Sequence, residues 1–243
     1  MLNRELIHKT IYSSADLNLQ IPDVDQMAEF LFKAIQPQET SLSTFKVEFI
    51  KKIGDEYILQ KSLYAGIIDQ FTALREQLAQ KNKQLLLCSW TQGNIYLQTQ
   101  KALVFQHLLP SSLLTNPSIY ASLNKMQLLP LAYQDLKKQD CDLICVIDDR
   151  LSNVLEAHRT LIAEQSHCLF IHKIRPDKVI THRLKHKEER IIECKEWAEV
   201  NRLLTEYKAN KIGLVLDKDG IVFNTTIYRQ LLEEALLNWK VSK

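Results

Sequence analysis

Four short, almost wholly apolar segments recur along the chain from residue 83 onward, and helical patterns separate them. The segments are KQLLLCS (83–89), CDLICVIDD (141–149), HCLFIHKI (167–174) and KIGLVL (211–216). A strand that is apolar on both of its faces is typical of a parallel sheet that helices cover on both sides. The stretches between the segments have the periodicity of helices of about 10–15 residues, so strands and helices alternate. The sequence therefore predicts an α/β fold with a Rossmann-like parallel sheet.

The first part of the chain predicts helices only. Residues 23–35 place Met27, Phe30 and Leu31 on one face at helical spacing, and residues 46–53 form a shorter amphipathic segment. No strand pattern interrupts this region. We therefore predict a small all-helical domain at residues 1–62, ahead of an α/β core at residues 63–225.

Composition and charge exclude several classes of protein. The chain has 243 residues, of which 46% are hydrophobic, so it can bury a sizeable core. The formal net charge of +2 gives no overall attraction to nucleic acid, and no run of about 18 apolar residues predicts a membrane span. The first residues lack the apolar stretch of a signal peptide. We expect a cytoplasmic protein without a membrane or nucleic-acid partner, although a protein delivered into another cell's cytosol would have the same composition.

The cysteines support the same compartment. The chain has five, none of them in a CxxC pair and most of them inside apolar segments. This pattern is typical of reduced core residues in a cytosolic protein rather than of a disulfide framework or a zinc site.

Polar or acidic residues follow three of the four predicted strands. They are Ser89 and Thr91 after the first strand, Asp148 and Asp149 at the end of the second, and Asp217 and Asp219 after the last. In open parallel sheets, ligands bind beyond the carboxyl ends of the strands, so these groups are expected along one edge. Carboxylates that converge there repel one another unless a cation is present, and oxygen ligands suit Mg²⁺. The sequence therefore predicts a magnesium site at this edge.

Each of these motifs also has a structural interpretation. DKDG is compatible with a hairpin turn, because Asp-Gly favours that geometry. Asp148 and Asp149 are also what a helix N-terminus favours, and Ser89 or Thr91 could cap a helix. Lys125, one of many lysines, is as compatible with a solvated surface as with a ligand role. Of the two hydroxyls, we favour Ser89 as the functional one.

Taken together, these segments resemble the motifs of the haloacid dehalogenase-like (HAD) hydrolase superfamily. VLDKDGIVFNT, which contains Asp217 and Asp219, is similar to the first motif, DxDG. Ser89 in LLCSWTQGN looks like the second motif, a hydroxyl that closes a strand. The stretch NKMQLLPLAYQDLKKQDCDLICVIDD looks like the third and fourth motifs together, with Lys125 near its start and Asp148 and Asp149 at its end.

The resemblance implies phosphoryl transfer through an aspartyl-phosphate. Asp217 would be the nucleophile, and Asp219 the general acid and then the general base. Lys125 and Ser89 would bind the phosphoryl oxygens. Asp217, the backbone carbonyl of Asp219, and Asp148 or Asp149 would hold Mg²⁺. The implied function is a Mg²⁺-dependent phosphatase acting on a small phosphorylated substrate; the alternatives are a phosphomutase of the same superfamily and a HAD-shaped binding module.

The order of the motifs differs from that of the superfamily. The family runs one, two, three, four, whereas this chain runs two, three, four, one. After Thr226, IYRQLLEEALLNW looks like the first cap helix, and residues 1–62 would supply the rest of a helical cap together with residues 226–243. We interpret the chain as circularly permuted, the alternative being a fragment of a longer protein. The interpretation requires the strand at 211–216 to lie between the strands that end at Ser89 and Asp148.

Two departures from the family pattern weaken the case for activity. Ile221 stands where the family commonly has threonine, and Asn224 stands where an acid is usual. The basic stretch at 172–190 is expected to be solvated surface. His182 and His186 within it have i,i+4 spacing, but no third metal ligand accompanies them. Trp90, beside the second motif, is compatible with lining the site or with packing.

Overall fold

The computed structural model describes residues 4–12, 24–37, 40–109, 118–122, 124–176 and 191–239. Internal contacts divide the chain into two compact units. We call them the helical unit (Met1–Leu63, Gly93–Val104 and Asn224–Lys243) and the sheet unit (Tyr64–Gln92 and Phe105–Phe223). Each unit combines segments that are distant in the sequence.

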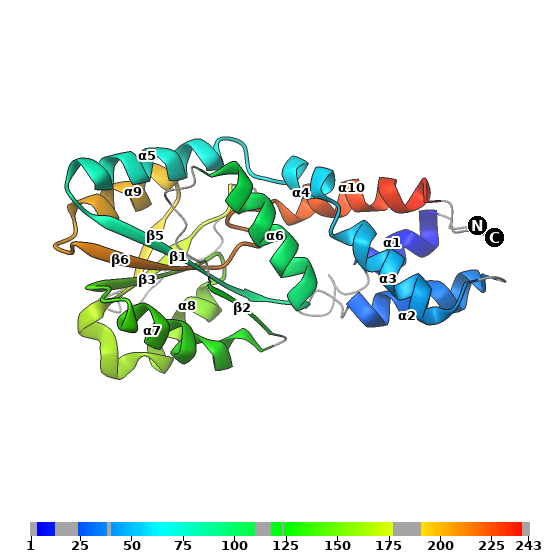
Figure 1. Cartoon of the computed structure of the whole chain (residues 1–243), viewed down its shortest axis with the longest axis horizontal. Coiled ribbons are helices and arrows are strands. Elements are labelled where there is room, and N and C mark those ends of the chain that lie inside the picture. Colours follow the sequence, from blue (N-terminus) through cyan, green and yellow to red (C-terminus); the bar gives the residue numbers. More distant parts are fainter. Residues whose placement is uncertain are drawn as a thin grey trace. The chain divides into compact units, whose positions relative to one another are not determined.

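The sheet unit contains a six-stranded sheet in which all neighbouring strands are parallel (Figure 1). The strand order is β2-β1-β6-β3-β4-β5. The bounds are β1 Gln84–Gln92, β2 Ser118–Ser122, β3 Leu143–Asp148, β4 Cys168–Lys173, β5 Ile191–Cys194 and β6 Lys211–Leu216. The predicted α/β fold with a parallel sheet is confirmed.

The last strand in sequence lies in the middle of the sheet. Leu214 of β6 pairs with Leu87 of β1 on one side and with Cys145 of β3 on the other. The predicted position of residues 211–216 between the strands that end near Ser89 and Asp148 is therefore confirmed. Because both neighbours of β6 are parallel to it, the residues after Leu216 are not the turn of a hairpin.

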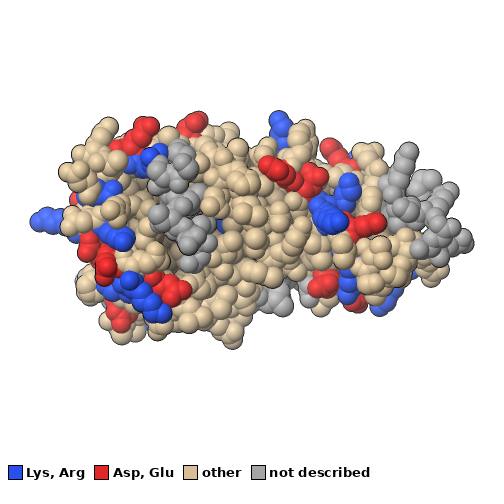
Figure 2. Space-filling model, viewed as in Figure 1, with Lys and Arg blue, Asp and Glu red and all other residues tan. Residues whose placement is uncertain are grey.

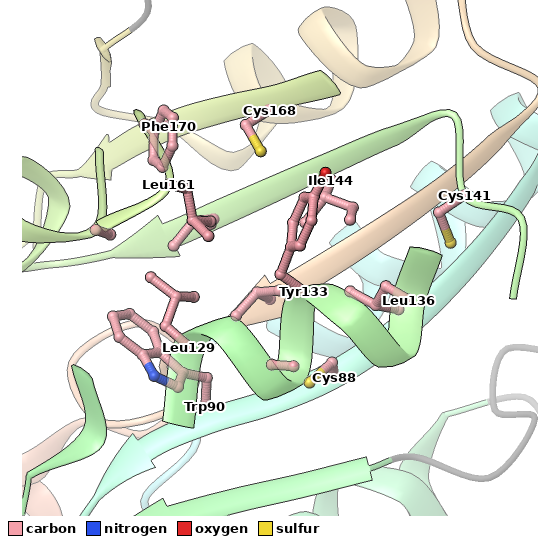
Figure 3. Close-up of a cluster of buried hydrophobic side chains, with 14 of the residues drawn as sticks. Cys88, Trp90, Leu129, Tyr133, Leu136, Cys141, Ile144, Leu161, Cys168 and Phe170 are labelled. Atoms are coloured by element: carbon pink, nitrogen blue, oxygen red, sulfur yellow. The ribbon is translucent and has the colours of Figure 1, made fainter. Parts of the chain in front are cut away.

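Helices cover both faces of the sheet. Figure 1 shows α5 (Ile67–Gln80) and α9 (Trp197–Glu206) on one face, and α7 (Leu129–Lys138) and α8 (Leu151–Thr160) on the other. Under α7 and α8 lies a buried cluster that includes Trp90, Leu136 and Phe170 (Figure 3). This double cover explains why β3 is buried along its whole length.

Gly213 allows α7 to approach the sheet closely. A Cβ atom at this position would lie 2.8 Å from Cδ1 of Leu136 and 3.2 Å from Sγ of Cys141. Distances this short are incompatible with a side chain unless the neighbours shift. The glycine in the middle of β6 is therefore explained by the packing of Leu136.

The two edge strands, β2 and β5, were not predicted from the sequence. Ser118–Ser122 and Ile191–Cys194 are short, and most of their described side chains are only half-buried. A strand with one exposed face and few residues lacks the continuous apolar run that marked β1, β3, β4 and β6.

The helical unit contains α1 (Arg4–Tyr12), α2 (Val24–Ile35), α3 (Leu42–Ile53), α4 (Glu56–Lys61) and α10 (Thr225–Leu237). Ser41 caps α3, with its side chain accepting from the backbone N–H of Thr44, and Asn224 caps α10 in the same way. The hydroxyl of Tyr228 on α10 donates to the carbonyl of Ile53 at 2.7 Å. Hydrogen bonding thus joins α10 to the N-terminal helices.

The helical unit also takes in Gly93–Val104, which the sequence analysis placed in the core. Helix α6 (Ile95–Leu108) therefore begins in the helical unit and ends in the sheet unit. Apolar residues occur all round α6, so its sequence pattern did not indicate which unit it belongs to.

Two surface predictions concern membranes and nucleic acids. Within the described ranges, no helix combines the length and the apolar character that crossing a membrane needs. On the face shown in Figure 2, basic and acidic side chains are interspersed. Most of the basic stretch at 172–190, including His182 and His186, lies outside the described residues.

Candidate functional site

The carboxyl ends of β3 and β6 bring two aspartates together. β3 ends at Asp148, and Asp217 follows directly after β6. The backbone N–H of Asp217 donates to the carbonyl of Ile147 at 3.0 Å, which continues the pairing of the two strands by one residue. Asp217 is therefore held in place by the sheet itself, and it lies at the same edge as Asp148, as the strand-end pattern predicted.

Lys125 connects these two carboxylates. Its Nζ donates to Oδ2 of Asp148 and to Oδ2 of Asp217, and its side chain is only 4% exposed. The lysine predicted from the third motif thus lies in the cluster rather than on a solvated surface. A buried ammonium between two carboxylates is held in its charged form, and the two acids accordingly raise the pKa of Lys125 against the opposing effect of burial.

Trp90 positions Lys125. The Nζ of Lys125 lies 4.3 Å from the centroid of the Trp90 ring, a cation–π contact. The indole N–H of Trp90 donates to the backbone carbonyl of Lys125 at 2.6 Å. Trp90 therefore packs in the core and also holds Lys125 in position.

Of the three converging acids, Asp148 accepts the most hydrogen bonds. Its Oδ1 accepts from the backbone N–H of Arg150 at 2.8 Å. The side-chain amide of Asn153 lies 3.2 Å from Oδ1 and 3.1 Å from Oδ2. With Lys125 added, both oxygens have donors. The structural interpretation of Asp148 as a group at a helix N-terminus also holds, because Arg150 is the N-cap residue of α8, which begins at Leu151.

Asp149 has a different partner, Arg175, which lies just beyond β4. The Nε of Arg175 donates to Oδ2 of Asp149, and both side chains are largely buried. The imidazole Nε2 of His172 lies 3.2 Å from the backbone carbonyl of Asp149. Arg175 belongs to the basic stretch that was expected to be solvated surface, and this expectation is wrong for Arg175, which is largely buried against Asp149. Its position directly after a predicted strand was the available signal.

Gly220 packs onto this ion pair. It adopts a φ of +81°, and a Cβ atom there would lie 2.5 Å from both Nη2 of Arg175 and Oδ2 of Asp149. The glycine of DKDG is thus required twice, by its positive φ and by the close approach of the ion pair. The preceding residue, Asp219, is half-buried, and its backbone N–H donates to Oδ1 of Asp217 at 3.3 Å.

Three carboxylates converge. Oxygens of Asp148, Asp149 and Asp217 lie within 4.8 Å of one another. Two oxygens on one Mg²⁺ are at most about 4.2 Å apart, given bonds of about 2.1 Å, so a small inward movement would let these residues hold the ion. Asp219 is not part of this group of three. Hard oxygen donors are the right type for Mg²⁺, and the donor set therefore fits it.

The charge of the cluster is incompletely balanced. Burial raises the pKa of Asp217 to about 6; Lys125 opposes this rise, while Asp148 and Asp219 add to it. Burial likewise raises the pKa of Asp149 despite the neighbouring Arg175. When the three converging acids are ionised, they carry three negative charges, and the two cations in direct ion pairs with them, Lys125 and Arg175, carry two positive ones. An additional cation would therefore stabilise the ionised site.

Ser89 is placed differently from the acids. Its strand neighbour Trp90 faces Lys125, and side chains alternate along a strand, so Ser89 and Thr91 point to the opposite face of the sheet. Both are buried, and neither hydroxyl has a hydrogen-bond partner among the described residues. The structure thus brings together Lys125, Asp148, Asp149 and Asp217, with Asp219 adjacent, while the phosphoryl-binding role of Ser89 stays a prediction.

Comparison with protein-family models, with curated proteins and with solved structures found no match to this chain.

Proposed function

We propose that the chain is a circularly permuted member of the HAD-like superfamily and a Mg²⁺-dependent phosphatase that hydrolyses a small phosphomonoester. The observation that carries this proposal is the buried contact of Lys125 with both Asp217 and Asp148, made from three separate segments of the chain. An ammonium group fixed between acids at the carboxyl edge of a parallel sheet is suited to hold a phosphoryl oxygen beside a carboxylate nucleophile.

The residues supply the following chemistry. A carboxylate oxygen of Asp217 attacks phosphorus and the bond from phosphorus to the alcohol oxygen breaks, leaving an aspartyl-phosphate. Asp219 donates a proton to the departing alcohol oxygen. In the second step Asp219 takes a proton from water, the water oxygen attacks phosphorus, and the bond to Asp217 breaks to release inorganic phosphate.

Asp217, Asp148 and Asp149 are the residues that would hold Mg²⁺, together with the backbone carbonyl of Asp219. The bound ion would polarise the phosphoryl oxygens. The direct ion pairs support this set, because Lys125 and Arg175 supply two positive charges against three carboxylates, and a divalent ion would exceed the difference. The remaining positive charge suits an anionic phosphate group.

A binding module of the same shape is the second candidate, and two residues favour it. Ile221, where the family commonly has threonine, is a core residue at 2% exposure. Asn224, where an acid is usual, accepts hydrogen bonds from the backbone N–H groups of Thr226 and Ile227 and so caps α10. Both residues therefore have structural roles here instead of the family's usual side chains.

The proposal is tested by phosphate release from p-nitrophenyl phosphate in the presence of Mg²⁺. Asp217→Asn should lower turnover by about 10³-fold or more, because an amide is not a nucleophile at phosphorus. Asp140→Asn is the matched control, since Asp140 is an exposed turn residue of the same unit with φ +58°, which asparagine tolerates. Equal turnover in the two variants would refute the catalytic assignment.

The same protein distinguishes the binding module from the enzyme. Beryllium fluoride with Mg²⁺ imitates a phosphoryl group on a carboxylate and should raise the melting temperature of the enzyme. A folded chain that shows neither this rise nor turnover would be a module without a phosphoryl site.

A further inference from the structure

Asp149 and Arg175 form an ion pair at the edge of the cluster, and the proposed chemistry assigns no role to the arginine. The guanidinium is largely buried, with 11% of the side chain exposed, and Asp149 is more deeply buried still, with 2% exposed. A charge pair this far from solvent is screened little by water or salt. Arg175 therefore acts strongly on whatever else approaches the carboxylate of Asp149.

Of the three converging acids, Asp149 is the one at which a bound cation would compete most directly with a charged protein side chain. Asp148 accepts donors on both of its oxygens, from Arg150, Asn153 and Lys125. Its hydrogen bonding is thus built into the start of α8. Asp149, by contrast, is held through Oδ2 by the side chain of Arg175, which reaches it from beyond β4.

We propose that Arg175 is an internal counter-ion of Asp149 that competes with the divalent cation and so lowers the affinity of the site for it. This inference rests on the proposed metal site. Arg175 is a positioning residue in this role: it acts on the cation through Asp149. The packing of Gly220 against both side chains shows that the pair is a fixed part of the site rather than a chance surface contact.

The size of the effect follows from the behaviour of carboxylates beside arginine. An arginine within about 4–6 Å changes the proton affinity of a carboxylate by about 10- to 1000-fold. The same repulsion acts on a cation that approaches that carboxylate. Removal of the charge of Arg175 should therefore tighten Mn²⁺ or Mg²⁺ binding by about tenfold or more.

The test is calorimetric titration of the full chain with MnCl₂ and with MgCl₂ at pH 8, without substrate. Arg175→Gln should bind the cation at least about tenfold more tightly than the wild type, and Arg175→Lys, which keeps the charge, should stay within about threefold of it. Arg175→Met is a second neutral variant should the glutamine variant fail to fold. Arg159→Gln, which removes an exposed charge from α8, is the matched control and should bind like the wild type.

Each outcome has a distinct meaning. If the wild type binds the cation and the folded neutral variants bind equally or more weakly, Arg175 does not compete and the inference is wrong, while the proposed metal site stands. If all variants, including Arg175→Lys, bind more weakly, the arginine orients Asp149 instead of opposing the cation, which also overturns the inference. If neither the wild type nor any variant binds Mn²⁺ or Mg²⁺, the metal site of the proposed function fails as well.

Discussion

The ammonium group of Lys125 and the carboxylate of Asp217 are buried hydrogen-bond partners, although 92 residues separate them in the chain. The parallel order β1-β6-β3 makes this contact possible, because it places the end of β6 beside the end of β3. Lys125 arrives from a separate segment and touches both strand ends. The buried site therefore depends on the sheet order and on the packing around β6.

Lys125→Met should lower the free energy of unfolding by about 3–5 kcal/mol at pH 8 in EDTA. The reason is that it leaves Asp148 and Asp217 buried without the ammonium group that contacts both of them. Urea denaturation measures the loss. Lys138→Met, at a side chain that is 75% exposed, should stay within about 0.5 kcal/mol of the wild type. Adding Asp217→Asn to the Lys125→Met variant should recover part of the loss. Equal stability of the two lysine variants would contradict the prediction.

Under the proposed function, Mg²⁺ should stabilise the folded chain, and this stabilisation should depend on pH through Asp217. Its pKa in the folded chain is about 6, above the ordinary 3.8, because the group is buried. A raised pKa means that the protonated carboxyl favours folding at low pH, and that this contribution is lost as the pH rises through about 6. The proposed site would bind the ion through the ionised carboxylate. The rise in melting temperature on adding Mg²⁺ should therefore be small at pH 5 and full at pH 7.5.

Asp217→Asn provides the control for this pH dependence. The asparagine does not titrate, so the Mg²⁺-induced shift in that variant should be small at both pH values. A wild-type shift that is as large at pH 5 as at pH 7.5 would show that Asp217 does not take up the proton in the metal-free site.

All five cysteine thiols should be unreactive in the native protein. Each of them is buried, and burial raises the pKa of Cys88 to about 12 and of Cys141 and Cys194 to about 11. Because the thiolate is the reactive form, Ellman's reagent at pH 8 should label none of them rapidly. Guanidinium chloride should release all five. Rapid labelling of even one thiol in the native chain would mean that a described core segment opens readily.

Gly213→Ala should destabilise the sheet unit by about 1–3 kcal/mol, because the new methyl group collides with Leu136. Leu136→Ala alone should also destabilise it, by about 2–5 kcal/mol, through the cavity it creates. The double variant should lose clearly less than the sum of the two, since the smaller residue at 136 makes room for the alanine. Strict additivity in urea denaturation would show that the two positions do not compete for the same space.

The interior strands were predictable because they are apolar on both faces. β1, β3, β4 and β6 each carry a run that matches a doubly covered parallel strand. β2 and β5 carry no such run, since an edge strand is partly exposed to solvent and need not be apolar on both faces. Their pairing is decided by neighbours that are distant in the sequence, and sequence patterns do not contain that information directly.

The site was predictable only in part, for a similar reason. The position of Asp217, Asp148 and Asp149 follows from strand ends alone, whereas the ion pair of Asp149 with Arg175 depends on how β4 lies against β3. The orientation of Ser89 depends on alternation along β1, because a shift of one residue moves a side chain to the other face. Trp90 could not be assigned until its contacts with Lys125 were known.

The central place of β6 has a consequence for synthesis on the ribosome. A nascent chain that has emerged only as far as α9 holds β1 and β3 with no strand to join them, and each presents an open row of backbone groups. The sheet can close only once Leu216 has left the exit tunnel. The native core therefore cannot form before β6 has emerged, and a stalled chain that ends before Leu216 should recruit chaperones.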